Sequence, residues 1–215
     1  MKWEIEMSLA RLSLCADTIN AQFSNYSLLD LGCRTMDLRP LLSECDSYMG
    51  TDLTAGEGVV QCDLEKPLSI EDKSYDIVVL LDVLEHLNNP HQAFREACRI
   101  ARKAFYVSLP NMFYIQFRWN FLIGRGISGK YTFHPHPIID RHRWVMSYYE
   151  AVNFVDANAD KYRVCHHMIL PTRGRTRRIT TPIESLLSDW MPNLFAYGLL
   201  SEIRTDSLED TRIGV

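Results

Sequence analysis

The feature that most constrains the fold is a series of short apolar segments, rich in valine, isoleucine and leucine, along the first half of the chain. They are residues 28–31, 48–52, 59–63, 75–82 and 104–109. Runs this short and this apolar are typical of strands that are buried on both faces of a parallel sheet. Residues 90–101 have helical periodicity, and Asn89-Pro90 is a favourable helix start. The alternation of strands with helices predicts an α/β sandwich with right-handed crossovers.

The length of 215 residues suits a single domain covering residues 1–215. Residues 1–26 are predicted to form an N-terminal helical segment, because apolar side chains recur at helical spacing. Residues 162–170 and 194–203 are predicted to be a closing pair of strands. Residues 112–147 are aromatic and basic, with a net charge of +4 against −8 for the rest of the chain. We interpret them as an insertion or lid, and residues 205–215 as a flexible tail.

Composition and charge exclude several classes of protein. Hydrophobic residues make up 47% and charged residues 23%, which excludes a mostly disordered chain. Because the net charge is −4, we do not expect a nucleic acid as partner. Mean hydropathy is −0.15, and no apolar run reaches the ~18 residues that a membrane span needs. Without a basic start and an uninterrupted apolar core, the N-terminus does not resemble a signal peptide, so we expect a cytoplasmic protein. The pattern leaves the oligomeric state open.

The six cysteines stand too far apart for a regular disulfide framework or a zinc site. We therefore expect free thiols. His134, His136 and His142 are the histidines that a metal would use, but proline-flanked loop histidines are more often contacts to solvent or substrate. The sequence accordingly predicts no metal site.

Four acidic residues stand at the ends of successive predicted strands: Asp30, Asp52, Asp63 and Asp82. In an open parallel sheet, ligands bind beyond the carboxyl ends of the strands. Asp52 follows Gly32 by 20 positions, close to the spacing expected for an acid that binds ribose hydroxyls. Aspartate is also an ordinary turn former. Four of them in register nevertheless favour a nucleotide-type ligand. A nicotinamide-dependent oxidoreductase is disfavoured because the GxGxxG motif is missing.

The ordered stretches LLDLGC (28–33), YMGTDL (48–53), VVQCDLEKPL (59–68), SYDIVVLLDVLEHLNNP (74–90) and FYVSLPN (105–111) carry a resemblance. They resemble the class I S-adenosylmethionine-dependent methyltransferases, especially the type-11 group and its relatives in methionine and quinone biosynthesis. The resemblance implies a Rossmann-like, doubly wound, mostly parallel sheet with helices on both faces and an antiparallel final strand. It also implies methyl transfer from S-adenosylmethionine, which we expect to act on an oxygen or nitrogen of a small-molecule acceptor.

The resemblance also implies the contacts of the cofactor. Asp30, Gly32 and Cys33 are expected beside its methionine moiety. Asp52 is expected to accept hydrogen bonds from both ribose hydroxyls. The remaining expected contacts are Leu53, Cys62, Asp63 and Leu64 around the adenine, and Leu81 and Asp82 near the sulfonium.

One departure from the family concerns the loop that normally reads Gly-x-Gly-x-Gly. Here it reads Gly32-Cys33-Arg34-Thr35-Met36. Glycine suits such a loop because a ligand approaches the bare backbone and because the turn needs positive φ. Arg34 either occludes the methionine tail of the cofactor or points to solvent and binds a carboxylate. The alternative function is therefore a degenerate methyltransferase-like domain that binds or scaffolds without catalysis.

Candidate catalytic groups follow the predicted strand 75–82. His86 is placed to act as a general base, or else to cap the following helix, and Asp82 and Glu85 have the same dual status. Arg118, Arg125, His134 and Arg143 of the predicted lid are candidates for binding an anionic group of the acceptor.

Overall fold

The protein is described by a computed structural model that covers residues 2–127, 129–131, 133, 135–136, 141–170 and 186–206. A seven-stranded sheet runs through it in the order β3-β2-β1-β4-β5-β7-β6. The strands are β1 (Tyr26–Leu31), β2 (Cys45–Asp52), β3 (Val59–Gln61), β4 (Tyr75–Leu81), β5 (Ala101–Pro110), β6 (Arg163–Ile169) and β7 (Gly198–Arg204). Neighbours among β1 to β5 pair in parallel, and β7 is antiparallel to both β5 and β6. The predicted α/β class and the antiparallel final strand are confirmed.

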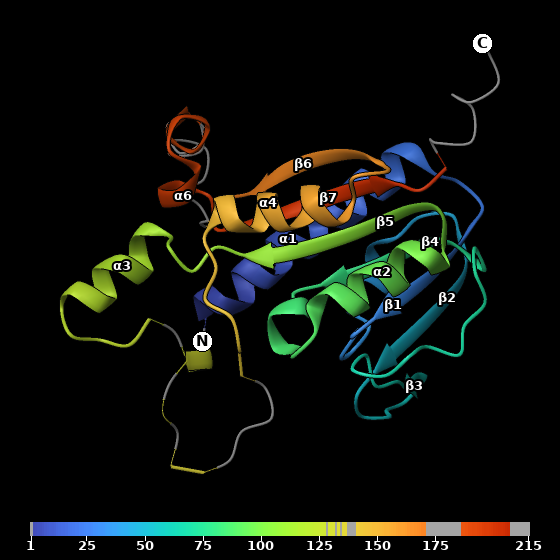
Figure 1. Cartoon of the computed structure of the whole chain (residues 1–215), viewed down its shortest axis with the longest axis horizontal. Coiled ribbons are helices and arrows are strands. Elements are labelled where there is room, and N and C mark those ends of the chain that lie inside the picture. The colour runs from blue at the N-terminus through green and yellow to red at the C-terminus, as the bar shows by residue number, and fades with distance from the viewer. Residues whose placement is uncertain are drawn as a thin grey trace.

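Helices lie on both faces of this sheet, with α2 and α4 on one face and α1 on the other (Figure 1). The helices are α1 (Lys2–Gln22), α2 (Pro90–Ile100), α3 (Ile115–Leu122), α4 (Tyr148–Asn158) and α6 (Pro192–Phe195), and residues 186–190 are also helical. Short 3-10 helices are η1 (Arg39–Leu41), η2 (Leu84–His86) and η3 (Gly129–Tyr131). No helix in the described part of the chain is long and apolar enough to cross a bilayer.

The face under α2 and α4 is the larger apolar core. Phe94 of α2 packs edge-on against Phe105 of β5, with ring centroids 5.1 Å apart. The predicted start of α2 is confirmed: Asn89 Oδ1 accepts a hydrogen bond from the Gln92 amide at 3.3 Å, and Pro90 takes the first helical position. A capping box at Ser147 starts α4 in the same way. Local caps therefore fix where these two helices begin.

The opposite face is covered by the N-terminal helix α1. Its buried residues Leu12, Cys15, Ala16 and Ile19 pack in one cluster with residues of β1, β4 and β5. The connections 32–44, 53–58 and 62–74 lie wholly within the described residues and contain no α-helix. The helix on this face thus comes from the start of the chain, not from the β1–β2 or β2–β3 crossover that the simple alternation of strands and helices predicts.

The predicted lid begins directly after β5. It contains α3, a helix that the sequence analysis did not anticipate, at the end of the sheet where β5 terminates (Figure 1). Phe117 of α3 forms a small separate core with Met112 and Tyr114, against which Tyr131 and Tyr197 pack. Other large side chains of α3 are exposed, among them Trp119, Phe121 and Leu122. Whether this segment closes over a ligand stays a prediction.

Candidate functional site

The four predicted aspartates lie at the carboxyl ends of four parallel strands. Asp30 is the penultimate residue of β1 and Asp52 the last residue of β2, while Asp63 and Asp82 follow β3 and β4. Because β3, β2, β1 and β4 are adjacent and parallel, these carboxyl ends share one edge of the sheet. The tertiary structure therefore brings the four acids to the same edge, as the sequence predicts.

Asp30 is the most buried of the four, with 4% of its surface exposed. Its Oδ2 accepts a hydrogen bond from the Tyr48 hydroxyl. Burial raises the pKa of Asp30 to about 7, because the charged carboxylate is removed from water, and Asp52 raises it further; Tyr48 and Arg11 act in the opposite direction. The Asp30 carboxyl group is thus fixed in position by the Tyr48 hydroxyl. Tyr48 was missed by sequence reasoning, since it stands in β2 as an ordinary strand tyrosine.

The loop after β1 has positive φ at the three positions where the family motif has glycine, although only the first of them is glycine here. Gly32, Arg34 and Met36 all have positive φ, at 80°, 52° and 56°. Gly32 is also sterically required, since a Cβ there would lie 2.5 Å from Cγ2 of Val83. Alternate left-handed residues place the backbone in the conformation that glycine adopts most readily. Arg34 and Met36 therefore hold backbone conformations that favour glycine, at two positions where this sequence has none.

Two side chains of this loop pack onto β2, and a third is exposed. A Cβ on Gly50 of β2 would lie 2.8 Å from Cys33 Sγ and 2.9 Å from Met36 Cγ, so both side chains pack onto β2. Arg34 is exposed. Its amide donates a hydrogen bond of 2.9 Å to Oδ2 of Asp52, which ties the loop to the end of β2. Of the two expectations for Arg34, the exposed position favours a side chain directed to solvent.

The residues expected around an adenine lie at the ends of β2 and β3. Leu53 is 52% exposed and Leu64 is buried, while Cys62 is partly buried. Asp63 accepts a hydrogen bond from the Glu65 amide at 3.1 Å, and an ion pair of 3.0 Å links it to Lys66. These contacts lower the pKa of Asp63, with the Lys66 hydrogen bond as the largest cause. Asp63 is therefore a partly exposed carboxylate whose oxygens already have protein partners.

The Asp82 side chain, at the end of β4, contacts residues of β5 and α1. Its Oδ1 accepts a hydrogen bond of 2.6 Å from the Ser108 hydroxyl, and its Oδ2 forms an ion pair with Arg11 of α1. Asp82 also has a positive φ of 53°. Leu81 beside it is buried. Arg11 was missed by the sequence analysis because it lies 71 residues away. The feature of the sequence that could have indicated this ion pair is a single arginine next to the buried positions of α1.

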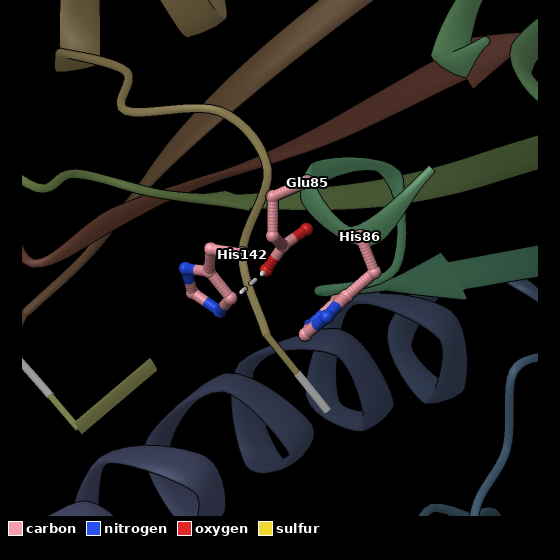
Figure 2. Close-up of side chains that lie close together, drawn as sticks. All are labelled: Glu85, His86 and His142. Carbon is pink, nitrogen blue, oxygen red and sulfur yellow. Dashed lines mark ion pairs between the residues drawn. The ribbon is translucent and has the colours of Figure 1, made fainter. Parts of the chain in front are cut away.

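Immediately after Asp82, Glu85 and His86 meet His142, a residue of the predicted lid (Figure 2). Glu85 is fully buried, and neither of its carboxylate oxygens accepts a hydrogen bond within the described part of the chain. Burial, reinforced by the nearby Asp82, raises the pKa of Glu85 well above its usual value. His86 Nδ1 lies 3.0 Å from the carbonyl oxygen of Arg141. The sequence analysis treated these residues separately, because 57 positions separate Glu85 from His142.

The residues predicted to bind an acceptor are less clustered. Arg118 Nε donates to the carbonyl of Phe113 at 2.6 Å, and Arg125 is exposed beyond α3. Arg143 Nε donates to the carbonyl of His86 at 2.7 Å, which places it next to the predicted base. His134 lies outside the described residues. The structure thus brings Arg143 to the site edge and leaves Arg118 and Arg125 on and beyond α3.

Comparison with known families adds one sequence match. Residues 29–107 match the family described as a methyltransferase domain. The matched region spans β1 to β5 and includes the loop after β1, the four strand-end aspartates and η2. No match was found among curated proteins.

The similar solved structures described here are distant in sequence. The small RNA methyltransferase HEN1 has a TM-score of 0.64 and 15% identity over 92% of this chain, which spans 25% of that longer protein. A chain of the Haloferax volcanii complex between the Trm112 activator and a methyltransferase has a TM-score of 0.56 and 16% identity, covering 93% of this chain and 91% of its own. An S-adenosylmethionine-dependent methyltransferase from Archaeoglobus fulgidus has a TM-score of 0.56 and 17% identity, covering 92% and 94%. At such identities the likeness establishes the fold.

Proposed function

Because the chain carries a class I S-adenosylmethionine-dependent methyltransferase domain, we propose that it transfers a methyl group to a small-molecule acceptor at the carboxyl edge of β1 to β4. The observation that carries this proposal is the retained left-handed backbone at Arg34 and Met36 beside the strand-end carboxylates. Residues held at positive φ are costly and cluster at ligand-binding sites, which supports a cofactor-binding role for this loop.

The residues present fit the cofactor. Asp52 retains acceptor capacity for ribose hydroxyls, because the Arg34 amide uses one direction of Oδ2 and the Thr54 amide one direction of Oδ1. The exposed side chain of Leu53 offers an apolar surface for an adenine ring. Asp30, Gly32 and Cys33 border the methionine moiety in this proposal, Asp63 takes the adenine amino group, and Cys62, Leu64 and Leu81 line the rest.

The chemistry requires alignment more than a particular catalytic group. When bound, S-adenosylmethionine supplies the methyl carbon, which forms a bond with the acceptor while its bond to sulfur breaks and that electron pair stays on sulfur. Asp82 offers negative charge near this point, oriented by Ser108 and Arg11. His86 and Asp82 are the candidates for taking up a proton from an acceptor hydroxyl.

The acceptor is proposed to be a small molecule because a net charge of −4 disfavours binding of a polyanion. The likeness to HEN1, described as a small RNA methyltransferase, gives RNA as the competing acceptor. An assay that compares total small-molecule extract with total RNA, using a labelled methyl donor, separates the two. We also propose a cytoplasmic location, supported by six free thiols.

The cofactor site is tested by Asp52→Ala, which removes charged hydrogen bonds worth about 1.5–3 kcal/mol. Calorimetry with S-adenosylmethionine and with S-adenosylhomocysteine is expected to show roughly 10- to 150-fold weaker binding. Asp46→Ala, at the opposite end of the same strand, is the matched control and is expected to bind as the wild type does. Unchanged affinity in Asp52→Ala would overturn the site assignment.

The alternative of a scaffold that binds without catalysis makes a different prediction. Such a protein would bind the cofactor without methylating any acceptor in either extract, or would bind neither form of the cofactor. The proposed methyltransferase is expected to bind both forms and to release S-adenosylhomocysteine in the presence of the acceptor extract.

A further inference from the structure

Three potential metal ligands converge beside Asp82. Figure 2 shows the Glu85 carboxylate close to the imidazole rings of His86 and His142. One ligand atom of each residue lies within 4.8 Å of the other two. Glu85 Oε1 is 3.7 Å from His142 Nε2, and the two imidazole centroids are 4.7 Å apart. Ligands held ~2.1 Å from a common tetrahedral ion are separated by ~3.4 Å, so a small closure of these side chains would satisfy the geometry.

The Glu85 carboxylate needs a partner of some kind. It is fully buried, and neither oxygen accepts a hydrogen bond within the described residues. A buried carboxylate without partners is costly, and proteins resolve this by pairing, protonation or metal coordination. Arg11 and Lys130 are close enough to favour its charged form, but Arg11 is already paired with Asp82. A bound cation would give both oxygens of this carboxylate a partner.

The segment that carries His142 is held firmly against η2. The Arg143 amide donates to the carbonyl of Glu85 at 2.8 Å, Arg143 Nε to the carbonyl of His86 at 2.7 Å, and Trp144 Nε1 to the carbonyl of Leu87 at 2.8 Å. These bonds join two parts of the chain on which the three side chains stand. Pre-positioned ligands lose little freedom when an ion binds, which strengthens binding.

The tautomer of His86 is set by a hydrogen bond to the same segment of the chain. Its Nδ1 lies 3.0 Å from the Arg141 carbonyl oxygen, which accepts hydrogen bonds only. Nδ1 must then carry a proton, so Nε2 is the ring nitrogen that a metal ion would use. A histidine that donates one ring N–H to a carbonyl and binds a metal through the other nitrogen is the usual arrangement in metal sites.

We propose that Glu85, His86 and His142 bind one divalent transition-metal ion, such as Zn²⁺, Mn²⁺ or Co²⁺. Two imidazoles and one carboxylate suit these ions and leave coordination positions open. This departs from the expectation of no metal, because no sequence motif pairs Glu85 and His86 with a histidine 56 or more positions away.

The position of the ion suggests its use, and this step rests on the proposed function. An acceptor hydroxyl bound to an open coordination position loses its proton more readily, because the metal stabilises the oxyanion. The proton would leave to solvent, and the oxygen would form a bond with the methyl carbon as the methyl–sulfur bond breaks and its electron pair stays on sulfur. His86 then serves as a ligand and not as the base, and the acceptor is an oxygen nucleophile.

The test measures metal binding directly. Protein stripped with EDTA and dialysed is titrated with Co²⁺ and followed by visible absorption, and with Zn²⁺, Mn²⁺ and Mg²⁺ by calorimetry. We expect one equivalent of Co²⁺ or Zn²⁺ to bind, and Mg²⁺ to bind more weakly because it prefers oxygen ligands. Glu85→Gln and His142→Asn should each weaken binding by more than the roughly 10- to 100-fold that loss of an outer-shell partner costs. His91→Asn, an exposed histidine of α2, is the matched control.

Circular dichroism confirms folding of each variant, and Glu85→Gln is expected to fold because it removes a buried charge. Absence of stoichiometric binding of Co²⁺, Zn²⁺ and Mn²⁺ would overturn the proposal, as would binding that survives both substitutions in folded protein. S-adenosylhomocysteine binding to the metal-free protein is measured in parallel. If the protein binds the metal ion but not S-adenosylhomocysteine, the proposed function is contradicted and the metal site is supported. If it binds S-adenosylhomocysteine but no metal ion, only the metal site is contradicted.

Discussion

At the scale of single residues, Arg34 and Met36 hold backbone conformations that L-amino acids adopt at a cost. The left-handed region costs a non-glycine residue about 1–2 kcal/mol in the folded state. Replacement by glycine removes this cost, but it also raises the entropy of the unfolded chain, which offsets part of the gain. The protein maintains this shape through main-chain contacts, such as the Arg34 amide on Asp52. The hydrogen bond of the Arg34 amide therefore holds the loop without using the exposed Arg34 side chain.

Arg34→Gly is expected to stabilise the protein by about 1 kcal/mol, because it relieves the left-handed strain and keeps the amide that binds Asp52. Urea unfolding measures the difference. Thr35→Gly, at a neighbouring position without positive φ, is expected to destabilise the protein. Equal losses in both variants would show that Arg34 contributes side-chain contacts that outweigh the strain.

Asp30 predicts a dependence of stability on pH. Its pKa is about 7 in the folded protein and lower when unfolded, because burial disfavours the charged carboxylate. Between about pH 4 and about pH 7 the folded state therefore binds more protons than the unfolded state, so the free energy of unfolding falls as pH rises, by up to about 1.4 kcal/mol per pH unit.

Asp30→Asn should flatten that dependence and raise stability at pH 8, with Tyr48 still able to donate to the amide oxygen. Glu85 contributes in the same direction, so some slope is expected to remain. Asp46→Asn, an exposed acid of β2, serves as the control. A slope unchanged in Asp30→Asn would contradict the burial argument.

At the scale of elements, α1 replaces the helices that the β1–β2 and β2–β3 connections lack. It covers one face of the sheet and also delivers Arg11 to Asp82. A helix from the start of the chain thus completes both the core and the charge arrangement of the site. The packing of α1 is consequently tied to the integrity of the site.

Ile19→Ala is expected to destabilise the protein by about 2–5 kcal/mol, because Ile19 is fully buried under the sheet and its removal leaves a cavity. Leu9→Ala, 52% exposed on the same helix, should change stability by less than about 0.5 kcal/mol. Thermal unfolding of both variants is the measurement. Similar small effects in the two would mean that α1 does not pack as described.

At the scale of the whole molecule, stability is concentrated in the middle of the sheet. All residues of β4 after Tyr75 are buried, whereas β3 buries only one of its three residues and lies at the sheet edge. Local opening is cheapest where few apolar contacts must break. The cofactor edge spans both regions, from the central β4 to the marginal β3.

Hydrogen exchange followed by mass spectrometry is expected to show the slowest exchange in peptides from β4 and β5 and fast exchange in residues 53–61. Added S-adenosylhomocysteine should slow exchange at residues 32–36 and 52–64, and leave β6 unchanged. Protection confined to other segments would contradict the proposed placement of the cofactor.

The sequence by itself determined where β1 to β6 lie, the α2 start and the edge that Asp30, Asp52, Asp63 and Asp82 share, but it began the last strand at residue 194, where the structure has α6 and β7 starts only at Gly198. These follow from local apolar runs, a local cap and the rule that parallel strands end together. Only the tertiary structure decided that Arg11 pairs with Asp82, that Arg34 keeps a left-handed backbone, and that His142 joins Glu85 and His86. Those contacts join residues far apart in the chain or depend on backbone dihedral angles, and a one-dimensional pattern records neither.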